Sequence, residues 1–171
     1  MAKKSIATIE QTLVLLKPDT VKRGLIGRII QRFEDAGLKI IAMKMVWPDR
    51  TMARELYDDD LEKRKGKEVR EMMTKFLVEK GPIIAVVLEG ISAVEVVRKL
   101  VGGTEPKTAL PGTIRGDFAH LSYEHADRVK KGIANLIHSS GSKAEAEKEI
   151  KIWFKPNEIH DYNLSHEEFT R

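Results

Sequence analysis

His138 has the local sequence best suited to chemistry among the five histidines of the chain. It ends the apolar run Leu136-Ile137 and precedes Ser139-Ser140-Gly141-Ser142, small residues that can open a helix. This pattern predicts an imidazole at the C-terminal tip of a strand, beside a helix N-terminus that favours anions. A hydrogen-bonded structural histidine is the alternative that these residues leave open.

The other four histidines give weaker indications of a functional site. His120 and His125 lie five positions apart in a polar stretch with no obvious third ligand, so a metal site there stays an alternative. His160 and His166 lie in the polar C-terminal tail, where we expect them to be solvated. We therefore predict no metal ligands among the side chains.

A group of cations stands at predicted strand and loop ends, where binding sites are commonly built. Lys17 follows an apolar run. Arg98 lies on the predicted helix just before a glycine-rich loop, and Arg115 lies in that loop. An ammonium and two guanidinium groups suit a polyphosphate, and Thr104 and Thr113 add hydroxyl donors. For each cation taken alone, a solvated surface charge is the more common role, and only their shared place at strand and loop ends favours a binding site.

Several familiar chemistries are excluded. The chain has no cysteine, which removes disulfides, thiolate catalysis and iron–sulfur clusters. It also lacks the P-loop, the dinucleotide-binding glycine motif, the H-E-x-x-H zinc motif and the G-x-S-x-G nucleophile motif. If the chain binds phosphates, it must do so without any of these motifs.

The composition is that of an ordinary globular protein: 171 residues, 42% hydrophobic and 33% charged. We expect a single domain over residues 1–171, with a core at about 12–154 and a polar tail at 155–171. The net charge of +4 comes from interleaved charges, which fits small anionic ligands, or solubility alone, better than a dedicated nucleic-acid partner. No apolar run is long enough for a membrane span, and the N-terminus has no apolar signal segment, so we predict a cytoplasmic protein.

Hydrophobic patterning predicts the elements that must position these side chains. Four buried strands are expected at residues 12–16, 38–46, 83–88 and 134–138. Helices are expected at 20–36, across 51–80 with a break around 65–67, at 93–100, at 123–132 and at 143–154. The order is that of a ferredoxin-like split β-α-β sandwich: an α+β fold with a four-stranded antiparallel sheet, core helices on one face, an extra helical hairpin and a C-terminal helix.

Local signals also predict helix ends and a loop. Ser92 with Glu95, and Ser142 with Glu145, have the spacing of a capping box. Residues 102–118 contain four glycines and two prolines, which predicts a long loop.

Four motifs, in order, resemble those of nucleoside diphosphate kinases of the long-insert prokaryotic type. They are Lys17-Pro18-Asp19 with Arg23-Gly24-Leu25-Ile26-Gly27, the loop Pro111–Phe118 (PGTIRGDF), Asn135-Leu136-Ile137-His138-Ser139-Ser140, and Glu147-Lys148-Glu149-Ile150 with Trp153-Phe154. The match covers most of residues 12–154.

The resemblance implies a ping-pong phosphotransferase that maintains nucleoside triphosphate pools. It would move the γ-phosphate of a nucleoside triphosphate, typically ATP, to nucleoside diphosphates through a phosphorylated His138. Glu149 and Ser140 would orient the ring or support the network around it. An imidazole suits this role because it is substantially neutral near pH 7.

The resemblance also implies a binding set and partners. Phosphates and sugar would be bound by Lys17, Tyr57, Arg98, Thr104, Arg115 and Asn135. Mg²⁺ would bridge the nucleotide phosphates with few protein ligands. A homo-oligomer would form, with a hexamer favoured and a tetramer or dimer possible, and no membrane or dedicated nucleic-acid partner is implied.

The chain departs from the family pattern in three places. Segments 58–80 and 118–134 are longer than usual, and Gly141 stands where an acidic residue is common. The aromatic residue that normally covers the base is not evident; Val69 or Met72 could replace it, whereas Phe76 lies too late in the segment.

Two rival functions use the same fold. One is a catalytically idle nucleotide or nucleic-acid binder, and the other is a structural oligomer module. The retained His138, Lys17, Arg115, Asn135 and Glu149 count against both, because an idle relative would be expected to lose at least the histidine.

Overall fold

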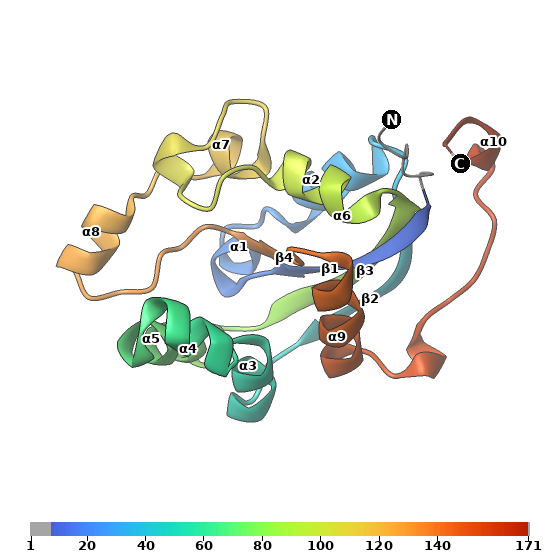
Figure 1. Cartoon of the computed structure of the whole chain (residues 1–171). Coiled ribbons are helices and arrows are strands. Elements are labelled where there is room, and N and C mark those ends of the chain that lie inside the picture. Colours follow the sequence, from blue (N-terminus) through green and yellow to red (C-terminus); the bar gives the residue numbers. More distant parts are fainter. Residues whose placement is uncertain (1–7, 171) are drawn as a thin grey trace, which may run out of the picture.

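A four-stranded antiparallel sheet with strand order β2-β3-β1-β4 forms the centre of the protein (Figure 1). The computed structural model describes residues 8–170; the other residues of the predicted 1–171 domain lie outside the described residues. The strands are β1 (Ile9–Leu16), β2 (Lys39–Val46), β3 (Ile83–Ile91) and β4 (Ile137–Ser139). This order confirms the predicted ferredoxin-like α+β fold.

The two central strands are apolar on both faces because both faces are covered. Val14 and Leu16 of β1 belong to one hydrophobic cluster, and Leu13 and Leu15 belong to another on the opposite face. Successive side chains of a strand point to opposite faces, so an unbroken apolar run builds both clusters at once.

Different sets of helices cover the two faces (Figure 1). The core helices α2 (Ile26–Glu34) and α6 (Ala93–Val101) pack on the first cluster. The second cluster is covered by α3 (Arg50–Leu56), α5 (Lys67–Glu79) and α9 (Lys143–Trp153). The extra hairpin and the C-terminal helix therefore cover the face that the core helices leave open.

Two predicted helices are divided. The expected helix at 20–36 is α1 (Pro18–Lys22) followed by α2, because Gly24 adopts a φ of 65° that a helix does not allow. In the stretch 51–80 the predicted break near Gly66 is present, at a φ of 89°. A further break before Asp58, the N-cap of α4 (Asp59–Lys65), separates α3 from α4.

The two predicted capping boxes differ from expectation. Ser92 has a left-handed backbone with a φ of 50° and makes no side-chain cap, so the prediction for α6 was wrong. Ser142 does cap α9 by accepting the Glu145 N–H at 3.2 Å. The Glu145 carboxylate accepts from the Gly141 N–H at 2.9 Å instead of closing the box on Ser142.

The segments around the candidate site are more regular than predicted. Residues 102–118 include the short helices η1 (Pro106–Thr108) and α7 (Ile114–Phe118). The helix expected at 123–132 is the shorter α8 (Tyr123–Arg128), and β4 begins later than the strand expected at 134–138.

The polar tail runs along the outer strand β2. It contains η2 (Pro156–Glu158) and α10 (Glu167–Thr170). The His160 N–H donates to the Ile41 carbonyl at 2.8 Å, and the Tyr162 hydroxyl donates to the Ile40 carbonyl at 2.5 Å. Over the described residues, the helices lack the length and apolar character needed to cross a membrane.

Candidate active site

A cavity of about 220 Å³ gathers most of the predicted site residues. Its walls come from the ends of β1 and α3, from α5, α6 and the loop after α6, and from α7 and β4 with the residues before it. The predicted residues that line it are Lys17, Tyr57, Arg98, Thr104, Arg115, Asn135 and His138. The two remaining predicted residues, Ser140 and Glu149, lie behind His138.

His138 lies on β4 opposite Leu15 of β1, with 23% of its side chain exposed. Its Nε2 lies 3.0 Å from each carboxylate oxygen of Glu149. An ionised carboxylate can only accept, so this contact places the ring proton on Nε2 and leaves the lone pair on Nδ1. In this tautomer Nδ1 is the ring nitrogen that is available as a nucleophile.

Glu149 is itself fixed by its neighbours. It lies on α9 and is only 8% exposed. The Ser140 hydroxyl donates to Glu149 Oε2 at 2.6 Å, and Ser140 Oγ accepts from the Leu13 N–H at 3.3 Å. This chain of bonds ties the carboxylate to β1, so the orientation of the His138 ring depends on the sheet.

Lys17 is a buried cation, only 5% exposed, at the junction of β1 and α1. Its Nζ donates to Asn135 Oδ1 at 2.5 Å. Burial lowers the pKa of Lys17 to about 8, the Asp19 carboxylate opposes that change, and the Arg115 charge adds to it. Lys17 is therefore mostly charged at pH 7.

Arg115 joins three parts of the cavity wall. Its guanidinium donates to the carbonyls of Asn135 at 3.1 Å, Gly102 at 2.9 Å and Ile137 at 2.7 Å. Burial lowers the pKa of Arg115 to about 10, so it stays charged at neutral pH. A guanidinium has five N–H donors, and those not used on carbonyls are available to an anion in the cavity.

Asn135 and Leu136 hold the entry to β4. The Asn135 amide accepts from Lys17 and donates to the Thr104 carbonyl at 2.9 Å. Leu136 has a φ of 70°, and its N–H donates to Asp19 Oδ2 at 2.8 Å. Its carbonyl accepts from the Thr20 hydroxyl at 2.6 Å.

Asp19 adjoins the site, although sequence reasoning quoted it in a motif without assigning it to the site. It orders the backbone two residues before His138, and its charge opposes the lowering of the pKa of both Lys17 and Arg115. The available signal was its place in the first turn of α1, directly after Lys17-Pro18.

Tyr57 and Arg98 complete the wall in different ways. Tyr57 is buried, and burial raises the pKa of its phenol, so it stays protonated. Arg70 holds the backbone there by donating to the Tyr57 carbonyl at 2.6 Å. Arg98 is exposed on α6 and reaches the cavity from the solvent side.

A larger cleft of about 540 Å³ adjoins this cavity, between the α4–α5 hairpin and the segment that carries α8. Val69, Met72 and Phe76 of α5 all line it. Phe76 reaches the cleft together with Val69 and Met72 because all three lie on α5. Tyr123 of α8 faces the cleft from the other wall.

Over the part of the chain that it describes, the structure does not add a third ligand to His120 and His125 for the alternative metal site. Among residues 8–170, no three His, Asp or Glu side chains come together as possible metal ligands. The charged side chains of the cavity beside His138 are Lys17, Arg98 and Arg115, a set that suits phosphate oxygens.

Fold and site together define a class: an α+β enzyme whose carboxylate-oriented histidine lies among cations, as a phosphotransferase requires. The model of one family, nucleoside diphosphate kinase, matches residues 10–159. The chain belongs to this family and is a nucleotide-binding phosphotransferase. The resemblance carried by the four motifs is confirmed.

Individual relatives agree with this assignment. A nucleoside diphosphate kinase of Pyrococcus furiosus is 48% identical over 95% of this chain and 94% of that protein. A solved transition-state mimic of the Borrelia burgdorferi enzyme with vanadate and ADP is 44% identical, with a TM-score of 0.92 over 95% of this chain and 96% of that chain. The enzyme of Halobacterium salinarum, solved in complex with CDP, is 35% identical with a TM-score of 0.80, over 95% and 98%.

Proposed function

We propose that the chain transfers the γ-phosphate of a nucleoside triphosphate, typically ATP, to nucleoside diphosphates by a ping-pong mechanism through phosphorylated His138. The observation that carries this proposal is the 3.0 Å contact of His138 Nε2 with Glu149, at the wall of a cavity that three cations share. It leaves Nδ1 as the free nucleophile.

In the first half-reaction, the Nδ1 lone pair attacks the γ-phosphorus. An N–P bond forms as the bond between the γ-phosphorus and the β–γ bridging oxygen breaks, and the nucleoside diphosphate leaves. The Glu149 carboxylate balances the positive charge of the substituted ring, which keeps its Nε2 proton. In the second half-reaction, a terminal oxygen of an acceptor diphosphate attacks phosphorus and restores the neutral imidazole.

Lys17, Arg98 and Arg115 stabilise the charge on the transferring phosphoryl group. Two of these cations are held within the wall, Lys17 by Asn135 and Arg115 by three carbonyls, so little reorganisation is needed during the transfer. Tyr57, Thr104 and Asn135 position the remaining phosphate and sugar groups. The substrate is the Mg²⁺ complex of the nucleotide, whose metal ligands are phosphate oxygens and water.

The proposal also covers the domain organisation, the oligomeric state and the compartment of the enzyme. A single domain carries the whole activity and assembles as a homo-oligomer, with a hexamer favoured. The enzyme acts in the cytoplasm, on the nucleoside triphosphate and deoxynucleoside triphosphate pools.

The test is a pulse and chase. Purified protein is incubated with γ-labelled ATP and Mg²⁺, and unlabelled GDP is then added. We expect an acid-labile, base-stable label on the protein that passes to GTP, because phosphohistidine forms and turns over.

The His138→Gln variant is the matched control, since it keeps a polar side chain of similar reach in β4. It should bind nucleotide and fold as the wild type does, without label and without GTP. Turnover above background in this variant would remove His138 from its role.

A further inference from the structure

The ammonium of Lys17 has two neighbours that are not acidic. One is Asn135 Oδ1 at 2.5 Å, and the other is the ring of Phe76, whose centroid lies 5.2 Å from Lys17 Nζ. A cation within about 6 Å of a ring centroid and over its face is attracted by the ring quadrupole. The interaction is strongest where water is excluded, and Lys17 is only 5% exposed.

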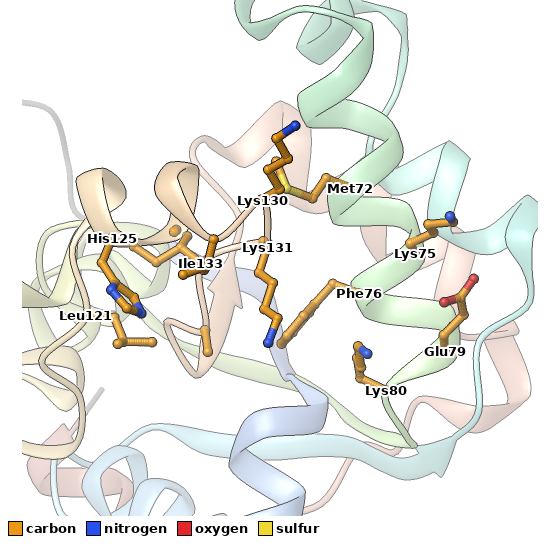
Figure 2. Close-up of a pocket in the computed structure, with 14 residues that line it drawn as sticks. Met72, Lys75, Phe76, Glu79, Lys80, Leu121, His125, Lys130, Lys131 and Ile133 are labelled. Atoms are coloured by element: carbon orange, nitrogen blue, oxygen red, sulfur yellow. The ribbon is translucent and has the colours of Figure 1, made fainter.

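Phe76 is held in place from two sides. It belongs to α5, and Figure 2 shows its ring pointing from that helix toward the segment that carries Lys131 and Ile133. A Cβ atom on Gly132 would lie 3.5 Å from the Phe76 Cβ, so this segment passes in close contact with it. Phe76 lines both the cleft beside Lys17 and a second cavity of about 370 Å³ between α5 and residues 121–134.

Within residues 8–170, the hydrogen-bond partner of the Lys17 ammonium is the Asn135 amide and not a carboxylate. Asp19 of α1 is the acidic neighbour, and its Oδ2 accepts the Leu136 N–H. The other titratable groups that line the two cavities with Lys17 are Tyr57 after α3, Arg98 of α6, Arg115 of α7, Lys131 before β4 and His138 of β4. Farther out, the cleft adds Arg64 and Lys65 of α4 and Asp127 and Tyr123 of α8.

We propose that Phe76 is a positioning residue for Lys17: its ring face keeps the buried ammonium charged and directed into the phosphate cavity. Cations outnumber carboxylates around Lys17, so an uncharged but electron-rich surface is the partner that adds no competing anion beside the phosphates. The functional part of this inference rests on the proposed phosphate role of Lys17.

The lowered pKa of Lys17 makes the proposal measurable. Burial already brings that pKa to about 8, within the working range of an assay. Removing the ring should lower it further, because only the charged form is attracted to the ring. The expected shift is about 0.4 to 1.5 pH units.

The experiment is competitive labelling of amines with a small acylating reagent over a range of pH, quantified for the Lys17 peptide by mass spectrometry. It compares the wild type, Phe76→Leu, and Phe76→Tyr, which restores a ring. Tyr162→Leu is the matched control, because Tyr162 places a ring 4.7 Å from the Lys39 ammonium at the far edge of the sheet. The rate of phosphoenzyme formation is measured over the same pH range.

We expect the labelling midpoint of Lys17 to fall in Phe76→Leu, to stay near the wild-type value in Phe76→Tyr, and to be unchanged in Tyr162→Leu. The alkaline limb of phosphoenzyme formation should move with it. Loosened packing alone would change labelling rates at every pH without moving the midpoint.

Two outcomes would contradict the role of Phe76 or the phosphate role of Lys17. An unmoved midpoint in Phe76→Leu, with a raised KM for nucleotide, would overturn the inference and assign Phe76 to the cleft alone. A midpoint that moves while the alkaline limb stays fixed would uphold the contact and overturn the phosphate role of Lys17, so the two failures are distinguishable.

Discussion

At the scale of single residues, the buried charge of Lys17 lowers the free energy of unfolding. Lys17 is enclosed by protein and bonded to a neutral amide. Burial lowers its pKa from 10.5 to about 8, which means that the folded state disfavours the charge it needs for phosphate.

Replacing Lys17 by Met should therefore separate stability from activity. We expect the free energy of unfolding at pH 7 to rise by about 1–2 kcal/mol, since the penalty of the buried charge is removed and the lost bond to Asn135 offsets part of it. Phosphoenzyme formation should fall at least about 100-fold. Denaturant unfolding and a labelling time course measure the two effects.

The control for this variant is Lys99→Met, which removes an exposed lysine of α6 and should change neither quantity. A Lys17→Met protein that is less stable than the wild type would mean that its ammonium contributes more by its contacts than it costs by its burial.

The same residue predicts the alkaline behaviour of the enzyme. Phosphoenzyme formation at low nucleotide concentration should decline as pH rises through about 8, where folded Lys17 loses its proton. Stability should respond in the opposite sense: between pH 8 and 10.5 the unfolded chain binds more protons at Lys17, so this group makes the fold more stable as pH rises. A rate profile and unfolding curves between pH 7 and 10 test both signs, and a rate that holds constant to pH 10 would contradict the first.

At the scale of elements, the short helix α7 positions Arg115. It packs so closely on the preceding loop that there is no room for a side chain at Gly116. A Cβ atom on Gly116 would lie 2.1 Å from the Leu110 carbonyl oxygen. A backbone carbonyl cannot rotate away as a flexible side chain can, so either α7 or the preceding loop must move. Movement of α7 would pull Arg115 from its three carbonyl partners.

Gly116→Ala should therefore cost about 2 kcal/mol or more of stability and most of the activity. Gly27→Ala is the matched control, because Gly27 lies in the first turn of α2 with nothing within 4 Å of its added Cβ. That variant should be as stable as the wild type or slightly more so. Thermal unfolding compares the pair, and equal midpoints would show that the loop before α7 yields easily.

At the scale of the whole molecule, β2 is an edge strand that the tail covers only in part. Lys39, at its start, is 2% exposed and lies beneath the tail, where Asp161 is 3.5 Å away. Farther along the same strand, Met43 and Met45 are 56% and 59% exposed at alternate positions, and thus on one face. Exposed apolar side chains on an edge strand are typical of a surface that another chain covers.

We predict that these methionines lie in a contact between copies of this chain. Light scattering of the wild type should give a multiple of 19.4 kDa, with six copies favoured. Met43→Glu combined with Met45→Glu should lower that mass, because each buried carboxylate would lack a partner. Glu substitution at the exposed Phe169 of α10 is the control, and an unchanged mass in the double variant would place the contact elsewhere.

The sequence by itself predicted four strands, most helices and a set of candidate site residues, seven of which line one cavity, because each prediction depends on spacing along a short stretch of chain. Apolar runs predicted the four strands, and the motifs around Lys17, Arg115 and His138 predicted the family. It did not predict the left-handed Ser92 or the break at Gly24, where backbone angles override side-chain capping and helical spacing.

Only the tertiary structure decided how these residues act on one another. Lys17 and Asn135 are 118 positions apart, and their contact exists because β1 and β4 are neighbours in the sheet. The proton on His138 Nε2 follows from the approach of α9, and the ring over Lys17 follows from the packing of α5. Local patterns carry no information on such distances, because the hydrophobic clusters on the two sheet faces set them as the helices pack.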